Sequence, residues 1–102
     1  MSANPKSFER TLQLTSIDTG DVRDIVVRLG YPERDPAPGG DHRVLIEIDG
    51  FDQPYSRYFH GVDELQALLS GSWLVPKILP SLVPAGARLT WLGQDDLGFE
   101  IS

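Results

Sequence analysis

The chain has 102 residues, of which 40% are hydrophobic, and this length suffices for one compact domain but not for two domains with a cleft between them. It carries 9 Lys and Arg against 15 Asp and Glu, for a net charge of −6, and no cysteine. Nucleic acid and anionic membranes are therefore poor partners, and disulfides, thiolate metal sites and cysteine nucleophiles are excluded.

The amino-terminal part predicts two strands joined by a tight turn. Apolar and polar residues alternate over residues 8–15 and again over residues 24–29, which is typical of half-buried strands. Residues 18–21 supply a turn in which Gly20 is free to adopt a positive φ. We therefore expect an antiparallel hairpin, preceded by a flexible N-terminus over residues 1–7.

A long loop and two further strands follow the hairpin. Residues 30–41 contain three prolines, each of which removes a backbone donor, so no regular strand is expected there. Alternation returns over residues 44–49 and over residues 55–60, and the second of these segments has aromatic side chains on both faces.

A helix is expected to follow these strands. Asp63 with Gln66 three residues later has the form of a capping box, which marks a helix start. Apolar residues then recur at spacings of three and four. Pro76 cannot donate to the carbonyl of Ser72, so we predict a kink or break near Ser72.

Two short strands, over residues 88–92 and 97–101, are predicted after the helix. The resulting order is β-β-β-β-α-β-β. It predicts a single α+β domain over residues 8–102, with an antiparallel sheet of about six strands and one long, kinked helix packed on one face.

The chain offers few groups for catalysis. His42 and His60 are its two histidines, and neither lies in a metal-ligand spacing. The paired acidic residues at 63–64 and 95–96 are explained by capping and by turn formation. We therefore assign no catalytic, cofactor-binding or metal-binding residue, and expect no cofactor and no enzymatic activity.

Two apolar segments favour a protein interface. Residues 73–83 hold seven apolar side chains that fall all around a helix, which is more than one sheet face can cover. Residues 51–59 hold four aromatic side chains, a type enriched at interfaces, although packing in the core would also explain them. We expect a homodimer or a complex with another protein, or else coverage by the loop over residues 30–41. The interface candidates are Trp73, Leu74, Val75, Ile78, Leu79, Leu82, Phe51, Tyr55 and Tyr58.

Two further readings stay open. The small size and acidity of the chain also suit an immunity or antitoxin protein that blocks a basic surface. A different class is a small-ligand-binding protein or enzyme with a pocket between the helix and the loop over residues 30–41, lined by Tyr31, His42, Tyr58 and His60. Because no run approaches the roughly 20 apolar residues of a membrane span and no apolar stretch follows Lys6, we expect a cytoplasmic protein.

Short motifs over most of the chain resemble a family of small uncharacterised bacterial proteins, classed as a domain of unknown function. They are Phe-Glu-Arg-Thr-Leu at 8–12, Arg-Leu-Gly at 28–30, Gly-Val-Asp-Glu-Leu-Gln-Ala-Leu at 61–68, and Leu-Thr-Trp and Leu-Gly-Phe at 89–91 and 97–99. The chain departs from the family at residues 73–83, where the family's helix is more regular, and at Glu100, where proline is expected. The resemblance implies a bacterial source and a compact α+β domain, and it brings no activity, cofactor or catalytic residue.

Overall fold

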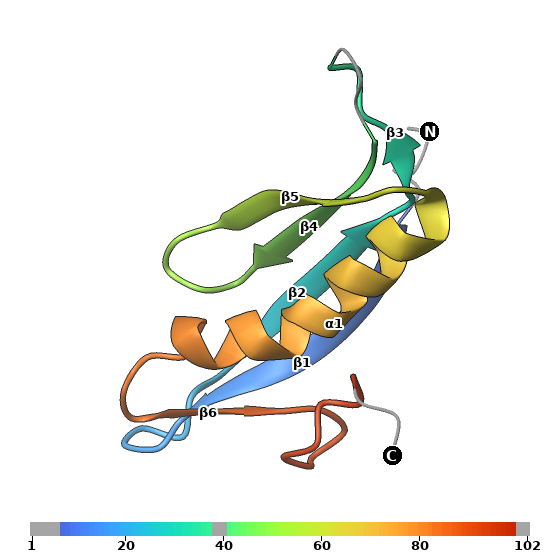
Figure 1. Cartoon of the computed structure of the whole chain (residues 1–102). Coiled ribbons are helices and arrows are strands. Elements are labelled where there is room, and N and C mark those ends of the chain that lie inside the picture. Colours follow the sequence, from blue (N-terminus) through green and yellow to red (C-terminus); the bar gives the residue numbers. More distant parts are fainter. Residues whose placement is uncertain (1–6, 38–40, 100–102) are drawn as a thin grey trace, which may run out of the picture.

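The computed structural model describes residues 7–37 and 41–99, which fold into one antiparallel sheet with one helix on one of its faces (Figure 1). The chain is therefore an α+β domain, as the sequence predicts. Its elements in chain order are β1 (Ser7–Ser16), β2 (Val22–Gly30), β3 (Glu33–Arg34), β4 (His42–Asp49), β5 (Tyr55–Gly61), α1 (Glu64–Leu82) and β6 (Ala87–Thr90).

Strands β5 and β6 lie at the two edges of the sheet. β5 pairs with β4 along residues 42–48, so the other side of β4 takes both β2 and the short β3. β2 pairs with β1 as the predicted hairpin, and β1 pairs with β6 only through residues 13–16. Among the described residues, no strand pairs with the outer edge of β5, or with the outer edge of β1 over residues 7–12.

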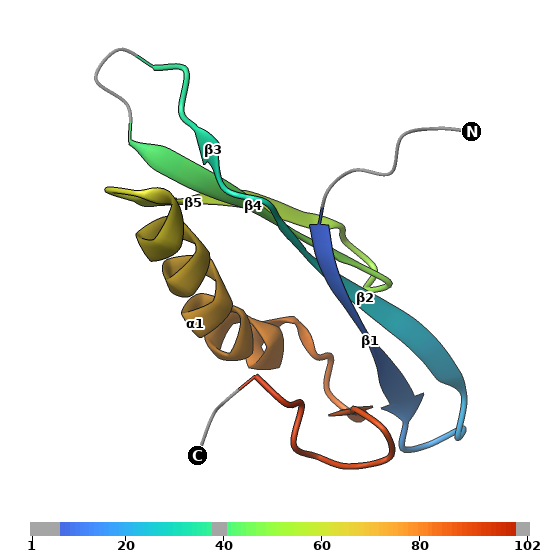
Figure 2. The same ribbon diagram turned by 90° about the vertical axis from the view of Figure 1, so that its right-hand side faces the viewer.

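The hydrophobic core lies between the sheet and α1. Side chains of a strand point alternately to its two faces, so every second residue of β1, β2 and β4 faces the helix. α1 packs against β4 and β5. The segment after β6 returns beside the helix (Figure 2). Its residues Trp91, Leu97 and Phe99 pack against the core. The buried apolar residues are Leu12, Leu14, Ile25, Val27, Val44, Ile46, Ile48, Ala67, Val75 and Leu79.

Two glycines bring α1 close to the sheet. A Cβ on Gly71 would lie 3.0 Å from Cγ1 of Val44 and 3.0 Å from Cδ1 of Leu29. A Cβ on Gly61 would lie 2.3 Å from the backbone nitrogen of Ala67, which has no room to move. Larger residues at these positions would push the helix away from β4 and β5.

The start of α1 has the predicted capping box. Oδ1 of Asp63 accepts a hydrogen bond of 2.7 Å from the backbone N–H of Gln66. The side-chain oxygen of Gln66 accepts one of 2.6 Å from the backbone N–H of Val62, one residue before the cap. Two backbone N–H groups at the start of the helix thus find acceptors in side chains from the same short segment.

The sequence predicts a kink or break of the helix near Ser72, but the structure shows no break there. α1 is one continuous helix of 19 residues that contains Pro76 and Pro80. Val75 and Leu79 lie on either side of Pro76, and both are buried against the sheet. This packing outweighs the hydrogen bond that Pro76 cannot make to the carbonyl of Ser72.

The strand predicted over residues 97–101 is wrong for the part that the structure describes. Residues 97–99 form no strand, and residues 100 and 101 lie outside the described residues. The carboxylate of Asp96 accepts a hydrogen bond of 2.9 Å from the N–H of Gly98, and Gly98 has a φ of 77°. This turn directs residues 97–99 onto the core instead of along the sheet.

The loop over residues 30–41 contains a short strand that the sequence did not indicate. Glu33 and Arg34 pair with the start of β4, and the Glu33 carboxylate lies 2.7 Å from Nε of Arg43. The observed order is therefore β-β-β-β-β-α-β, in place of the predicted β-β-β-β-α-β-β, whereas the expected number of six strands is confirmed.

Replacing the buried Leu79 by alanine is expected to lower the free energy of unfolding by about 2–5 kcal/mol, because the cavity left beneath α1 can close only in part. The matched control is Leu65→Ala, which makes the same change at a position on α1 that is 63% exposed and should cost less than about 0.5 kcal/mol. Urea denaturation measures both. Equal losses would contradict the packing of α1 described above.

Candidate functional site

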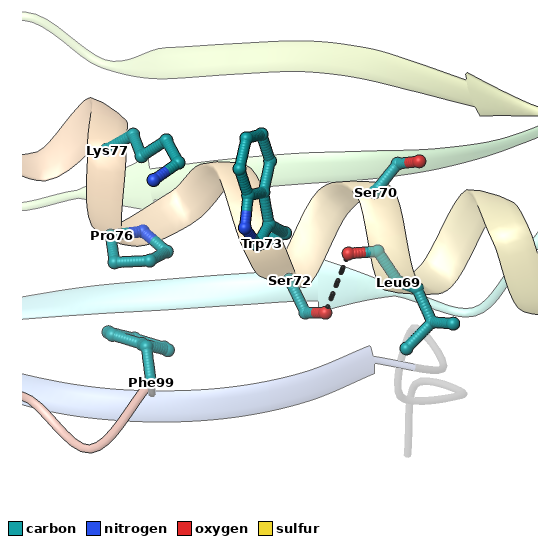
Figure 3. Close-up of a pocket in the computed structure, with 7 residues that line it drawn as sticks. All are labelled: Leu69, Ser70, Ser72, Trp73, Pro76, Lys77 and Phe99. Carbon is teal, nitrogen blue, oxygen red and sulfur yellow. Dashed lines mark hydrogen bonds between the residues drawn. The ribbon is translucent and has the colours of Figure 1, made fainter. Parts of the chain in front are cut away.

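A groove runs along α1, over the helix face that points away from the sheet and on the side that faces β1 (Figure 3). It consists of two cavities that share Ser72 and Phe99, which we call together the α1–β1 groove. The larger cavity, of about 610 Å³, is lined by Leu69, Ser70, Ser72, Trp73, Pro76, Lys77 and Phe99. The smaller, of about 330 Å³, is lined by Phe8, Glu9, Arg10, Val27, Leu29, Ser72, Val75, Gly98 and Phe99.

An apolar stripe on α1 borders the groove. Leu65, Leu69 and Trp73 follow one another at spacings of four, so they share the helix face that points away from the sheet. Val62 lies just before the N-cap Asp63 and extends the stripe at the start of the helix. Each of the four side chains is more than half exposed. Contiguous apolar surface of this kind is characteristic of interaction sites, because a monomer leaves it in contact with water.

Arg10 holds the other wall of the groove in place. Its guanidinium carbon lies 3.9 Å from the centre of the Trp91 ring and 4.8 Å from that of Phe99. Its Nη1 donates a hydrogen bond of 3.0 Å to the carbonyl oxygen of Leu97. Arg10 therefore fastens residues 97–99, which lack strand pairing, to the helix-facing side of β1.

The groove carries two cations. Besides Arg10, Nζ of Lys77 lies 4.2 Å from the centre of the Trp73 ring. Within the described residues, no carboxylate oxygen lies within 4.0 Å of either cation. The lining also includes Glu9, whose carboxylate is paired with Nε of Arg28 at 3.2 Å. In a chain of net charge −6, the part of the groove beside Lys77 is thus suited to a ligand with an anionic group.

The predicted interface residues divide between surface and core. Trp73 is 64% exposed on α1, and Tyr58 is 40% exposed on the other face of the sheet, where the Arg43 guanidinium lies 3.9 Å from its ring centre. Val75 and Leu79 are core residues in this chain. The remaining candidates are partly buried: Leu74, Ile78, Leu82, Phe51 and Tyr55.

The four residues of the alternative pocket do not converge. His42 shares the helix-facing side of the sheet with Val44, and its Nδ1 lies 3.4 Å from the carbonyl oxygen of Val62. Tyr58 and His60 lie on the opposite face. Tyr31 follows β2 and stacks on the ring of Phe8, with 4.8 Å between the ring centres. Because the sheet separates these side chains, they do not line one cavity.

Asp35 ties the loop over residues 30–41 to the sheet. Its carboxylate accepts a hydrogen bond of 2.9 Å from the N–H of Ala37, and it lies 3.0 Å from Nε2 of His60 and 4.0 Å from Nη1 of Arg43. The hydrogen bond from Ala37, together with the contacts to His60 and Arg43, holds the pKa of Asp35 below its usual value. These contacts explain His60 as part of a loop anchor.

The fold and the groove define a small α+β domain with an open groove beside its helix. Residues 8–101 match the family described as "Domain of unknown function (DUF6968)". The chain belongs to this family, which confirms the resemblance seen in its motifs to a family of unknown function. No curated protein and no solved structure matches the chain.

The described residues hold neither a metal-binding cluster nor a membrane-spanning helix. Over residues 7–37 and 41–99, no three His, Cys, Asp or Glu side chains gather in a way that would hold a metal ion. In the same residues, no helix is both long enough and apolar enough to cross a membrane.

Sequence reasoning did not single out Arg10, Phe8 or Phe99 as site residues. A signal for Arg10 is present, because it occupies an apolar position in the alternation between Phe8 and Leu12. A cation on the core-facing side of a strand requires a partner. That partner, residues 97–99, lies 87 positions away and only the fold brings it near.

Replacing Arg10 by alanine is expected to lower the free energy of unfolding by about 2 kcal/mol, since a charge-assisted hydrogen bond and two stacked rings lose their partner. Arg10→Lys should recover little, because an ammonium has no planar face to lie between Trp91 and Phe99. Arg34→Ala, at an exposed position on β3, is the control. Urea denaturation followed by tryptophan emission measures the change; an Arg10→Lys variant as stable as the wild type would contradict the role of Arg10.

Replacing Asp35 by asparagine is expected to reduce stability at neutral pH but not in acid. A carboxyl whose pKa is lower in the folded than in the unfolded chain stabilises the fold above its unfolded pKa of about 3.9, and this stability is lost as the pH falls through the folded pKa. The difference in Tm between the wild type and Asp35→Asn should therefore be smaller at pH 3 than at pH 5, with the decrease setting in below about pH 4. A difference that stayed the same at pH 3 would refute this account.

Proposed function

We propose that the chain is a non-enzymatic protein-interaction domain of a bacterial cytoplasmic protein, and that it binds another protein through the α1–β1 groove. The observation that carries this proposal is the uncovered apolar stripe of Val62, Leu65, Leu69 and Trp73 beside the groove. Burial of such a stripe by a partner releases water from apolar surface, which is the main driving force of protein association.

The charge of the groove supports a partner segment that is both apolar and acidic. Lys77 is exposed beside the Trp73 ring, where a carboxylate of the partner can reach it, and Arg10 lines the smaller cavity. A second copy of this chain fits the groove poorly, because contact about a two-fold axis places the same patch on both sides and so brings cations against cations. We therefore assign the groove to a different protein.

The chemistry of the groove supports a binding role and not a catalytic one. Its described lining includes the hydroxyls of Ser70 and Ser72, but no histidine that would activate them as nucleophiles. The narrower hypothesis of an immunity or antitoxin protein calls for a basic partner. The cations of the groove favour the opposite charge, so we place no basic toxin there.

Selection of random 12-residue peptides on the full chain tests the proposal. The enriched peptides should combine large apolar residues with Asp or Glu. Trp73→Ala should weaken the best peptide at least about tenfold, as loss of a central aromatic anchor does. Lys77→Ala should weaken the binding of this peptide less than Trp73→Ala does. Added salt should reduce the difference in affinity between Lys77→Ala and the wild type. Fluorescence anisotropy of a labelled peptide measures these affinities.

The matched control is Ile17→Ala, which truncates an equally exposed apolar residue, 68% exposed, outside the groove. It should bind the peptide as the wild type does. Failure to enrich any apolar, acidic consensus, or a selected peptide that binds Trp73→Ala with wild-type affinity, would refute the assignment of the groove.

A further inference from the structure

A second surface, away from the groove, has the properties of a self-association site. β5 is an edge strand whose seven residues all pair with β4, while its outer edge pairs with no strand among the described residues. An open edge of this length presents a row of unpaired backbone donors and acceptors. Natural edge strands are usually protected by charged side chains, proline or a bulge. The residues from Tyr55 to Gly61 include no lysine, carboxylate or proline, and their one charged residue, Arg57, can be matched by an aromatic ring of a second copy.

We propose that β5 pairs with β5 of a second copy of the chain, antiparallel and about a two-fold axis perpendicular to the sheet. This proposal goes beyond the function assigned to the groove, because it uses different residues and a different partner. The result is a dimer in which two sheets join into one continuous sheet, with both copies of α1 on the same face.

The sequence of β5 complements itself in one register. With the axis at Tyr58, all seven residues find a partner, and Tyr58 lies opposite its own copy. Arg57 then faces Phe59 of the second copy, and Ser56 faces His60 of the second copy. These are a cation–aromatic pair and a hydrogen-bonding pair, both of which stabilise a sheet. Moving the axis to Arg57 would place two guanidinium groups against each other and shorten the pairing.

The charge of β5 also favours a second copy. The chain has 15 carboxylates, yet none lies on β5. Two copies of an acidic protein therefore meet along β5 without acidic side chains facing each other.

A second long open edge, residues 7–12 of β1, is less suited to self-pairing, and the end strands β3 and β6 have only two and four residues. Side chains on the same face must lie opposite each other, so the axis falls on a residue and not between two residues. At the middle of this segment the axis falls on Glu9 or on Arg10, and either choice opposes like charges. β5 is therefore the edge that we assign to the dimer.

Disulfide cross-linking tests the register directly, because the chain has no cysteine of its own. Residues opposite each other in an antiparallel pair have Cα atoms about 4.5–5.5 Å apart, within the range that a disulfide spans. Tyr58→Cys should therefore give a covalent dimer rapidly under mild oxidation. Ser56→Cys is the matched control, because its two copies would be more than about 13 Å apart along the strands.

Two further measurements complete the test. Sedimentation equilibrium of the wild type should give twice the mass of one chain. Tyr58→Glu should give a monomer, because two carboxylates would meet at the axis. The fold of each chain should tolerate this glutamate, because the side chain at position 58 lies near Arg43 of the same chain. A monomeric wild type, or Tyr58→Cys that cross-links no faster than Ser56→Cys, would overturn the proposal.

The dimer and the groove can fail independently. Trp73→Ala should remain a dimer while losing the selected peptide, and Tyr58→Glu should keep the peptide while losing the dimer. If Trp73→Ala became monomeric and Tyr58→Glu stayed dimeric, the second copy would lie on the apolar stripe of α1, which would overturn the assignment to β5.

Discussion

The structure depends on the mismatch between the width of the sheet and the width of one helix. An α-helix with its side chains is about 10 Å across, and neighbouring strands are about 4.8 Å apart, so one helix covers about two strands. α1 covers β4 and β5, and the helix-facing side of β2 and β1 needs other cover. Residues 91–99 supply part of it, held by the guanidinium of Arg10 between Trp91 and Phe99. The α1–β1 groove is the space that this incomplete cover leaves.

The groove and the β5 edge are consistent with each other as parts of one binding protein. The groove runs over the outward face of α1 and towards β1, whereas β5 lies at the opposite edge of the sheet. The proposed dimer through β5 joins the two sheets at that edge, and it would present two identical grooves to the proposed partner. Linked sites of this kind raise apparent affinity without any new contact, provided that the partner also carries two copies of the recognised segment.

Local pattern predicted much of the fold, and it was wrong where distant contacts act. The hairpin of β1 and β2 and the capping box at Asp63 follow from residues that are near one another in sequence. The continuity of α1 through Pro76 does not follow from local sequence, because packing of the buried residues on either side of the proline keeps the helix intact. The position of residues 97–99 likewise depends on Arg10, which is distant in sequence and donates a hydrogen bond to the carbonyl oxygen of Leu97.

By itself the sequence determined the α+β class, five of the six strands, the start of the helix and the absence of cysteine chemistry. These are consequences of composition and of periodicity within short segments, whereas the family of unknown function follows from the resemblance of its motifs and from the family match. Only the tertiary structure decided which apolar residues are surface and which are core: Trp73 is exposed, whereas Val75 and Leu79 of the same helix are buried. The reason is that a helix presents every face to its surroundings, and only the position of the sheet selects the face that is covered.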